Sequence, residues 1–258
     1  MSKQPIGIFD SGVGGTSIWK EIHKLLPNEN TIYLADSINA PYGPKGKEAI
    51  TKLSIKNTEL LLKKGCKIIV VACNTATTNA IDYLRNTYNI PFIGIEPAIK
   101  PAALQTKNNA VGILATQGTL SSELFSKTAG KFASHIKVIE QVGEGLVDLI
   151  ENGKLHSNEM TALLKLYLKP MIQANIDYLV LGCTHYPYLM PQLIKLLPKH
   201  VKIIDSGEAV AKQTKAVLTR LDLLNYEKNT ANTFYTNGNL EVLKLLLEKD
   251  YNLNYLDF

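Results

Sequence analysis

The chain has 258 residues, of which 45% are hydrophobic and 20% charged. This composition is typical of a folded globular protein and excludes a disordered, collagen-like or membrane-spanning chain. The net charge of +5 comes from scattered lysines, so it gives only weak support to nucleic-acid binding.

Neither a secretory signal nor a membrane span is visible in the sequence. Residues 1–5 lead directly into an apolar segment, without the apolar core and small-residue cleavage site of a signal peptide. The longest apolar run, 68–73, is far shorter than the roughly 18 residues that cross a bilayer. Three cysteines do not make a disulfide framework and fit a reducing compartment. We therefore expect a cytoplasmic protein.

Short apolar segments alternate with longer amphipathic ones along the chain. Strands are predicted at 6–9, 31–35, 68–72, 92–95, 110–114, 135–140, 178–181 and 201–204. Helices are predicted at 16–26, 47–64, 77–88, 121–131, 145–151, 157–173, 189–197, 208–221 and 239–249. Several strands are apolar without alternation, as in sheets covered on both faces. The pattern predicts an α/β fold with mostly parallel sheets.

Three segments recur in the same order about 105–110 residues further along the chain. Segment 6–10 resembles 111–115, segment 70–75 resembles 180–185, and segment 94–96 resembles 203–205. We interpret this as two similar doubly wound α/β units. Two prolines within 96–101 suit a crossover between the units, and the chain can cross back near 205–207. The last fifty or so residues can then pack on either unit.

Two cysteines occupy equivalent places in these units. Cys73 and Cys183 each follow an apolar strand and precede a helical segment. Ligands bind at this edge of open α/β sheets, and free backbone N–H groups there favour a thiolate. A single cysteine on a strand is usually a small buried hydrophobe, but two in matching positions favour a pair of reactive thiols. Cys66 lies at the opposite end of the strand before Cys73 and is predicted to be structural.

A glycine-rich segment follows the first strand. Asp10 and Ser11 precede Gly12, Gly14 and Gly15, and this spacing fits no dinucleotide-binding fingerprint. The segment 43–48 likewise does not match a P-loop. Asp10 stands at the carboxyl end of its strand, as Cys73 does, so it is a candidate general base or partner of one. Its alternative role is an ordinary turn or helix cap.

Other polar residues lie near the same predicted edge. His185 is two residues from Cys183 and can assist proton transfer, or serve as a capping or core histidine. Tyr42 and Gly43 lie in a rigid turn after Pro41. The segment 116–119 opens the first helix of the second unit, as an anion-binding nest or merely a cap.

Two thiols on two facing units suggest symmetric chemistry at one carbon atom. A racemase needs a base on one face of that carbon and an acid on the other, with the roles exchanged in the reverse direction. A free amino acid offers a carboxylate and an ammonium group that hydroxyls and helix ends can bind. The predicted active site is therefore a cleft between the two units.

The same segments resemble the signature motifs of the glutamate racemase family, from about residue 6 to residue 206. The matching segments are Phe9-Asp10-Ser11-Gly12-Val13-Gly14-Gly15, Ala40-Pro41-Tyr42-Gly43, Ala72-Cys73-Asn74-Thr75-Ala76 and Leu181-Gly182-Cys183-Thr184-His185-Tyr186-Pro187. The resemblance implies an enzyme that needs no cofactor or metal and interconverts L- and D-glutamate for peptidoglycan synthesis. It also implies a homodimer. It further implies two domains, 1–97 with 207–258 and 98–206, because the family's C-terminal segment packs on the first unit.

The resemblance also assigns roles to residues. It makes Cys73 and Cys183 the catalytic acid/base pair, with Asp10 assisting Cys73 and His185 assisting Cys183. Glu151 is a further plausible member of the site. Substrate contacts fall on Asp10, Ser11, Tyr42, Gly43, Asn74, Thr75, Thr184 and His185, with Thr116 and Thr119 as additional candidates.

Four alternatives stay open at this point. The substrate can be aspartate rather than glutamate, since no residue measures the length of its side chain. A hydrolase with a cysteine nucleophile would use Cys183 and His185 but leave Cys73 without a role. A metal-binding or amino-acid-sensing module would use both cysteines, His185 and Asp10, although the spacing lacks a short paired motif. A pyridoxal-phosphate racemase would leave both cysteines without a role.

Overall fold

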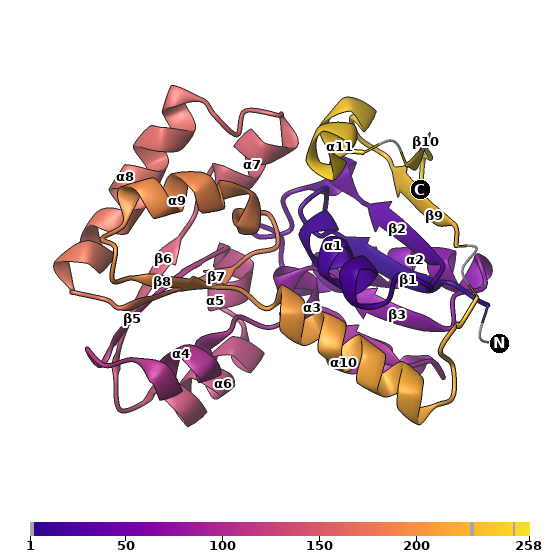
Figure 1. The fold of residues 1–258 in the computed structure, drawn as a ribbon, viewed down its shortest axis with the longest axis horizontal. Helices are drawn as coiled ribbons and strands as arrows, with labels where there is room; N and C mark the ends of the chain where they lie inside the picture. The colour runs from indigo at the N-terminus through magenta and orange to yellow at the C-terminus, as the bar shows by residue number, and fades with distance from the viewer. Residues whose placement is uncertain (1–2, 228–229, 250) are drawn as a thin grey trace.

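The computed structural model describes residues 3–227, 230–249 and 251–258 and contains two parallel sheets side by side (Figure 1). The six-stranded sheet has the order β10-β9-β2-β1-β3-β4, and the four-stranded sheet has the order β6-β5-β7-β8. The first sheet contains β1 (Ile6–Asp10), β2 (Thr31–Ala35), β3 (Ile68–Val71), β4 (Phe92–Gly94), β9 (Asn232–Thr236) and β10 (Asn252–Tyr255). The second contains β5 (Ala110–Ala115), β6 (Lys137–Val142), β7 (Tyr178–Gly182) and β8 (Lys202–Ile204).

Helices cover both sheets. Those of the first unit are α1 (Thr16–Leu25), α2 (Lys47–Lys63), α3 (Asn74–Thr87), α10 (Gly207–Arg220), α11 (Leu240–Leu247) and the 3-10 turn η1 (Ser37–Asn39). Those of the second are α4 (Ile99–Gln105), α5 (Gln117–Leu120), α6 (Glu123–Ala133), α7 (Leu146–Glu151), α8 (Asn158–Gln173), α9 (Met190–Leu196) and the 3-10 turn η2 (Tyr186–Leu189). Because the central strands are covered on both faces, β1, β3, β5 and β7 are buried along their whole length.

The two sheets share one topology, which confirms the predicted pair of similar units. The order β2-β1-β3-β4 in the first sheet repeats as β6-β5-β7-β8 in the second. The three recurring sequence segments fall on equivalent strands: β1 with β5, β3 with β7, and β4 with β8. Every pair of neighbouring strands within the described residues is parallel. The carboxyl ends of β3 and β7 therefore have equivalent positions in the two units.

The C-terminal region of the chain belongs to the first sheet. β9 pairs with β2, β10 pairs with β9, and α10 packs against α1. These two strands were not predicted, because their segments are polar and only partly buried at the edge of the sheet. Residues 1–2, 228–229 and 250, which the predicted domain ranges also include, lie outside the described residues.

Three helices differ from the sequence prediction. α3 begins at Asn74 rather than at residue 77, because Cys73 caps it: the Ala76 N–H donates to Cys73 Sγ. The predicted helix 121–131 corresponds to α6, which begins at Glu123 under the Ser122 hydroxyl cap, and the short helix α5 precedes it at 117–120. The presumed linker 96–101 enters α4 at Ile99, and Pro101 stands in its first turn, where its missing N–H costs nothing.

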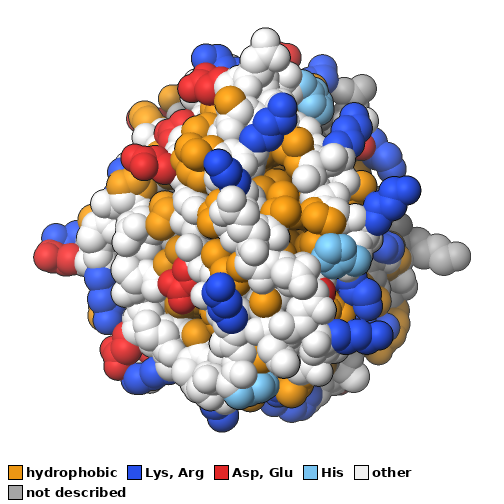
Figure 2. Space-filling view, turned by 90° about the vertical axis from the view of Figure 1, so that its left-hand side faces the viewer, with side chains coloured by type: hydrophobic (Ala, Val, Ile, Leu, Met, Phe, Trp, Pro, Cys, Tyr) orange, Lys and Arg blue, Asp and Glu red, His pale blue; other side chains and the backbone are white. Residues whose placement is uncertain are grey.

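None of the helices within the described ranges is long and apolar enough to cross a membrane. Exposed apolar side chains nevertheless occur on the second unit, among them Leu104, Leu166 and Ile194, each more than 60% exposed. In Figure 2, which shows the face of this unit that points away from the first, apolar side chains form a central band with lysines along its border.

Candidate active site

The two sheets bring both predicted cysteines into one buried site between the units. Cys73 follows β3 and Cys183 follows β7, and their side chains are 4% and 7% exposed. A charge on Cys183 contributes to raising the pKa of Cys73, so the two sulfur atoms are within electrostatic reach of each other. The structure therefore brings two buried thiols from equivalent strand ends close to each other.

Cys73 has no titratable hydrogen-bond partner among the described residues. Its Sγ donates to Ser11 Oγ over 3.7 Å and accepts from the Ala76 N–H over 3.4 Å. Burial, followed by the negative charge of Asp10, raises the pKa of this thiol well above its ordinary value. Cys73 is consequently held as a neutral thiol, although the N-terminus of α3 offers some stabilisation to a thiolate.

Cys183 instead contacts a histidine. Its Sγ lies 3.7 Å from Nδ1 of His185, and the opposite ring atom, Nε2, is 2.6 Å from Glu151 Oε1. Burial lowers the pKa of His185, but the hydrogen bonds to Cys183 and Glu151 and the nearby negative charges outweigh it. The pKa of His185 therefore lies well above its ordinary value. The Cys183 sulfur therefore lies against an imidazole that favours its charged form.

Asp10 is fully buried beside Thr184 and His185. Its Oδ2 accepts from the Gly15 N–H (2.8 Å) and the Gly12 N–H (3.3 Å), and Oδ1 accepts from the Thr184 hydroxyl (3.2 Å). Burial raises the pKa of Asp10 to about 6, although the positive charge of His185, 4.0 Å away, opposes the increase. Asp10 acts on Cys73 through its charge, whereas its described hydrogen bonds reach Thr184 and the glycine loop.

The glycine loop allows the two units to approach closely. A Cβ on Gly12 would lie 1.9 Å from Glu151 Oε1, and one on Gly14 would lie 2.2 Å from His185 Nδ1. The Val13 N–H donates to Glu151 Oε1 over 2.7 Å. Gly12 and Gly14 therefore make room for side chains of the other unit.

Three predicted substrate-binding residues form a cluster of hydroxyl groups across the two units. Oγ1 of Thr75, on α3, is 2.7 Å from Oγ1 of Thr116 and 3.3 Å from that of Thr119. Thr116 and Thr119 are 3.1 Å apart. The 43–47 loop lies against this cluster, because a Cβ on Gly43 would contact Thr116 at 3.0 Å. The cluster therefore offers hydroxyl donors to a carboxylate.

The remaining predicted residues have different surroundings. Asn74 is 3% exposed, and its Oδ1 has no hydrogen-bond partner in the described part of the chain. The Tyr42 hydroxyl is buried and donates to Asp36 Oδ2, while it accepts from Asn57 Nδ2 over 3.1 Å. The Tyr42 hydroxyl is thus already hydrogen-bonded to Asp36 and Asn57, whereas the unpartnered Asn74 amide oxygen is available to an ammonium group.

Asp36 was not identified from the sequence, and Glu151 was named there only as a further plausible member of the site. Asp36 directly follows β2, much as Asp10 ends β1, and it is fully buried; Lys56 Nζ lies 3.1 Å from its Oδ1. The equivalent position at a strand end was the available signal. Glu151 stands at the end of α7, and its role depends on the approach of His185 from 34 residues further along. No local pattern shows that contact.

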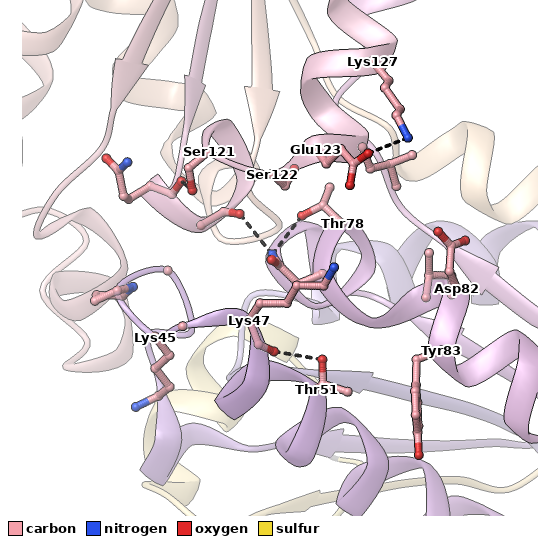
Figure 3. Close-up of a pocket in the computed structure, with 18 residues that line it drawn as sticks. Lys45, Lys47, Thr51, Thr78, Asp82, Tyr83, Ser121, Ser122, Glu123 and Lys127 are labelled. Carbon is pink, nitrogen blue, oxygen red and sulfur yellow. Dashed lines mark hydrogen bonds and ion pairs between the residues drawn. The ribbon is translucent and has the colours of Figure 1, made fainter.

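Two cavities adjoin the site without including the cysteines. One of about 450 Å³ lies between the 41–44 turn and residues 142–148. The other, of about 790 Å³, lies between the 43–47 loop, α3 and α6, and contains Lys45, Lys47 and Lys127 together with Asp82 and Glu123 (Figure 3). Within the described ranges, no group of three or more His, Cys, Asp or Glu side chains is arranged to hold a metal ion. The metal-module alternative therefore finds no donor set there.

Comparisons with known proteins agree with this geometry. A family model described as Asp/Glu/Hydantoin racemase matches residues 6–214. A glutamate racemase of Herpetosiphon aurantiacus is 47% identical over 225 residues, which are 87% of this chain and 89% of that protein.

Solved structures of glutamate racemases have the same fold. An isoform from Bacillus anthracis superposes with a TM-score of 0.90 at 31% identity, covering 100% of this chain and 98% of that one. The enzyme of Francisella tularensis, solved in complex with D-glutamate, gives a TM-score of 0.86 at 31% identity, with 100% and 98% coverage.

Proposed function

Because this chain belongs to the Asp/Glu/Hydantoin racemase family, as one of its glutamate racemases, we propose that it interconverts L- and D-glutamate by proton transfer between Cys73 and Cys183. The observation that carries the mechanism is the pair of buried thiols at equivalent strand ends, one beside a charged histidine and one beside a serine. Two-base racemisation requires this combination of one thiolate and one neutral thiol.

The reaction is balanced without a cofactor. The thiolate of Cys183 takes the α proton, so the C–H bond breaks, an S–H bond forms, and the electron pair remains on the α carbon. The Cys73 thiol then gives its proton to the opposite face of that carbon and becomes the thiolate. The product is the other enantiomer, and the enzyme is left in the protonation state that runs the reverse reaction.

The surrounding residues support these two transfers. His185, held by Glu151, stabilises the thiolate of Cys183, and the N-terminus of α3 stabilises that of Cys73. Asp10 fixes Thr184 and contributes negative charge near the substrate ammonium. The hydroxyl cluster formed by Thr75, Thr116 and Thr119 binds a carboxylate of the substrate. Ser11, Asn74, Thr184 and the backbone of the Tyr42–Gly43 turn complete the substrate site.

The finer biological setting is part of the same proposal. We assign the product D-glutamate to peptidoglycan synthesis in the cytoplasm and expect a homodimer, for which the exposed apolar side chains of the second unit offer contact area. We place the domains at 1–97 with 207–258 and at 98–206. Light scattering of the purified chain measures the oligomeric state directly.

Hydrogen exchange at the α carbon tests the chemistry. The purified protein is incubated with L-glutamate in D₂O without added cofactor, and circular dichroism and the α-proton signal are followed. Loss of optical activity with deuterium at the α carbon is the expected result. Exchange with aspartate alone would keep the mechanism and change the substrate. A stable acyl-enzyme adduct with an ester substrate, and no exchange, would support the cysteine hydrolase instead.

A further inference from the structure

The protein concentrates its arginines at one place. Among its 28 lysine and arginine residues only Arg85 and Arg220 are arginines, and both line a single surface cavity of about 320 Å³ on the first unit. Residues 90–94, Gln213 and Val217 complete the lining. Arg85 and Arg220 are 135 positions apart in the sequence, so the fold, not the sequence, brings them together.

The two arginines stand on either side of an edge strand. Arg85 is in the last turn of α3, Arg220 ends α10, and β4 is the outer strand of its sheet. Pro91 O faces β3, where it accepts from Ile69 N, whereas Phe92 O accepts from Arg85 Nη2 at 3.4 Å on the outer side. Since successive residues of a strand alternate, the Gly94 N–H also points outward. The cavity lining therefore includes two arginines and a strand whose Gly94 N–H faces outward.

These guanidinium groups form no ion pair with a described carboxylate. None of the described lining residues is acidic, and no described carboxylate forms an ion pair with Arg85 or Arg220. The lysine cavity in Figure 3 differs in this respect. It contains Asp82 and Glu123, and Lys127 Nζ is 2.7 Å from Glu123 Oε1. At the C-terminal end of a helix, lysine interacts with the helix dipole as favourably as arginine does. The presence of arginine at both positions therefore indicates recognition of a planar or tetrahedral oxyanion.

We propose that the arginine cavity, lined by Arg85 and Arg220, binds the phosphoryl group of a small metabolite. Two guanidinium forks match the oxygen geometry of a phosphoryl group, and their two positive charges match its charge of about −1.5 to −2 at pH 7, which a carboxylate does not reach. The cavity volume is at the lower end of the range for small-molecule sites. Ile90, Pro91 and Val217 offer apolar contact to the rest of the ligand.

The arginine cavity is connected to the reacting groups through two helices. α3 starts directly after Cys73 and ends near Arg85, and α10 starts at the return crossing between the units and ends at Arg220. The Ser206 hydroxyl donates to Glu96 O, which joins the return crossing to the outgoing one. A ligand held by both arginines ties α3 to α10 and so increases the stability of the first unit.

Calorimetric titration of the full-length protein with inorganic phosphate and pyrophosphate, at constant ionic strength, tests the proposal. Arg85→Gln and Arg220→Gln are each expected to weaken binding by about tenfold or more, because each removes charge-assisted hydrogen bonds. Arg220→Lys is expected to weaken it too, since lysine keeps the charge but loses the fork. The double variant Lys45→Gln/Lys47→Gln, in the lysine cavity, is the matched control and retains full affinity.

Folding of the variants is checked by racemisation without phosphate, which is expected to stay within about twofold of the wild type because neither arginine lies in the reaction site. Three results would overturn the proposal. They are a heat of binding with phosphate no larger than with chloride, a phosphate affinity of both arginine variants equal to that of the wild type, or tighter binding of succinate than of phosphate.

Discussion

The surroundings of the two cysteines differ although the strands that carry them are equivalent. Cys73 contacts a serine hydroxyl and the first turn of α3, and its thiol has a raised pKa. Cys183 contacts His185, whose far nitrogen is held by Glu151. The same strand order occurs in both units, but it presents a neutral thiol in one unit and a thiol next to a cation in the other.

In the proposed mechanism, this difference distinguishes the roles of the two cysteines. Equal surroundings would favour the same protonation state at both, and two thiolates in one buried site would repel each other. The charged His185 lies beside Cys183, whereas Cys73 contacts the Ser11 hydroxyl and the Ala76 N–H. We expect the symmetry of the fold to give access to both faces of the substrate, and the asymmetry of the side chains to distinguish the two proton transfers.

Removal of either thiol has the largest expected effect. Cys73→Ala and Cys183→Ala should each reduce racemisation by at least about 10³-fold, because one of the two proton transfers loses its acid or base. Polarimetry with each enantiomer measures the loss. Cys66→Ala is the matched control: this thiol is also buried, but it lies at the opposite end of β3. Near-wild-type activity of either active-site variant in both directions would contradict the two-base mechanism.

Removal of the histidine should affect the two cysteines unequally. His185→Gln is expected to slow racemisation by about 10²-fold, since Cys183 loses the cation that stabilises its thiolate. Deuterium exchange measured separately from L- and D-glutamate should slow more for the enantiomer whose proton Cys183 removes. Glu151→Gln, which leaves the imidazole in place, should give a smaller change with the same preference. Equal slowing of both exchanges would show that His185 does not serve one cysteine alone.

Asp10 should produce a pH dependence near its raised pKa of about 6. As the pH falls through this value, the carboxylate is protonated and kcat/KM should decrease. Asp10→Asn has no such group, so the decrease in kcat/KM near pH 6 should disappear. If the decrease persists in this variant, another residue causes it.

Asp10 has the opposite effect on stability. Between its ordinary pKa of 3.8 and about 6, the folded chain keeps a proton that the unfolded chain has released. The contribution of Asp10 to the free energy of unfolding should therefore decrease as the pH rises across this interval. Urea denaturation at several pH values, compared between the wild type and Asp10→Asn, measures this contribution.

The smallest effect is expected at the partner of Cys73. The Ser11 hydroxyl accepts from Cys73 Sγ over 3.7 Å, a long contact to an uncharged group. Ser11→Ala should therefore reduce the rate only a few-fold, mainly through kcat, as steady-state kinetics will show. A loss as large as that of His185→Gln would mean that both cysteines depend equally on their neighbours and would remove the distinction between them.

The sequence predicted the two-unit fold because apolar strands and helical periodicity are local signals. The equivalence of β1 with β5 and of β3 with β7 was visible as recurring segments, and both cysteines were found from their place in them. β9 and β10 were not found, because their polar segments contain no apolar run. Their strand character comes from pairing: β9 pairs with β2, and β10 pairs with β9.

The partners of the cysteines were only partly accessible from the sequence. His185 was found because it is two residues from Cys183. The contact of Glu151 with His185 and the packing of the glycine loop against both arise only when the units meet. The paired arginines have no sequence signal for the same reason: their proximity depends on the packing of α3, β4 and α10.

The sheet order also has a consequence for folding of the chain during its synthesis on the ribosome. All strands of the second sheet lie between residues 110 and 204, but the first sheet takes its last two strands from residues 232–255. The outer side of β2 therefore stays unpaired until residues 232–236 have been synthesised. All strands of the second unit have been synthesised before the first unit receives β9 and β10. The unit whose synthesis begins first is therefore the last to complete its sheet.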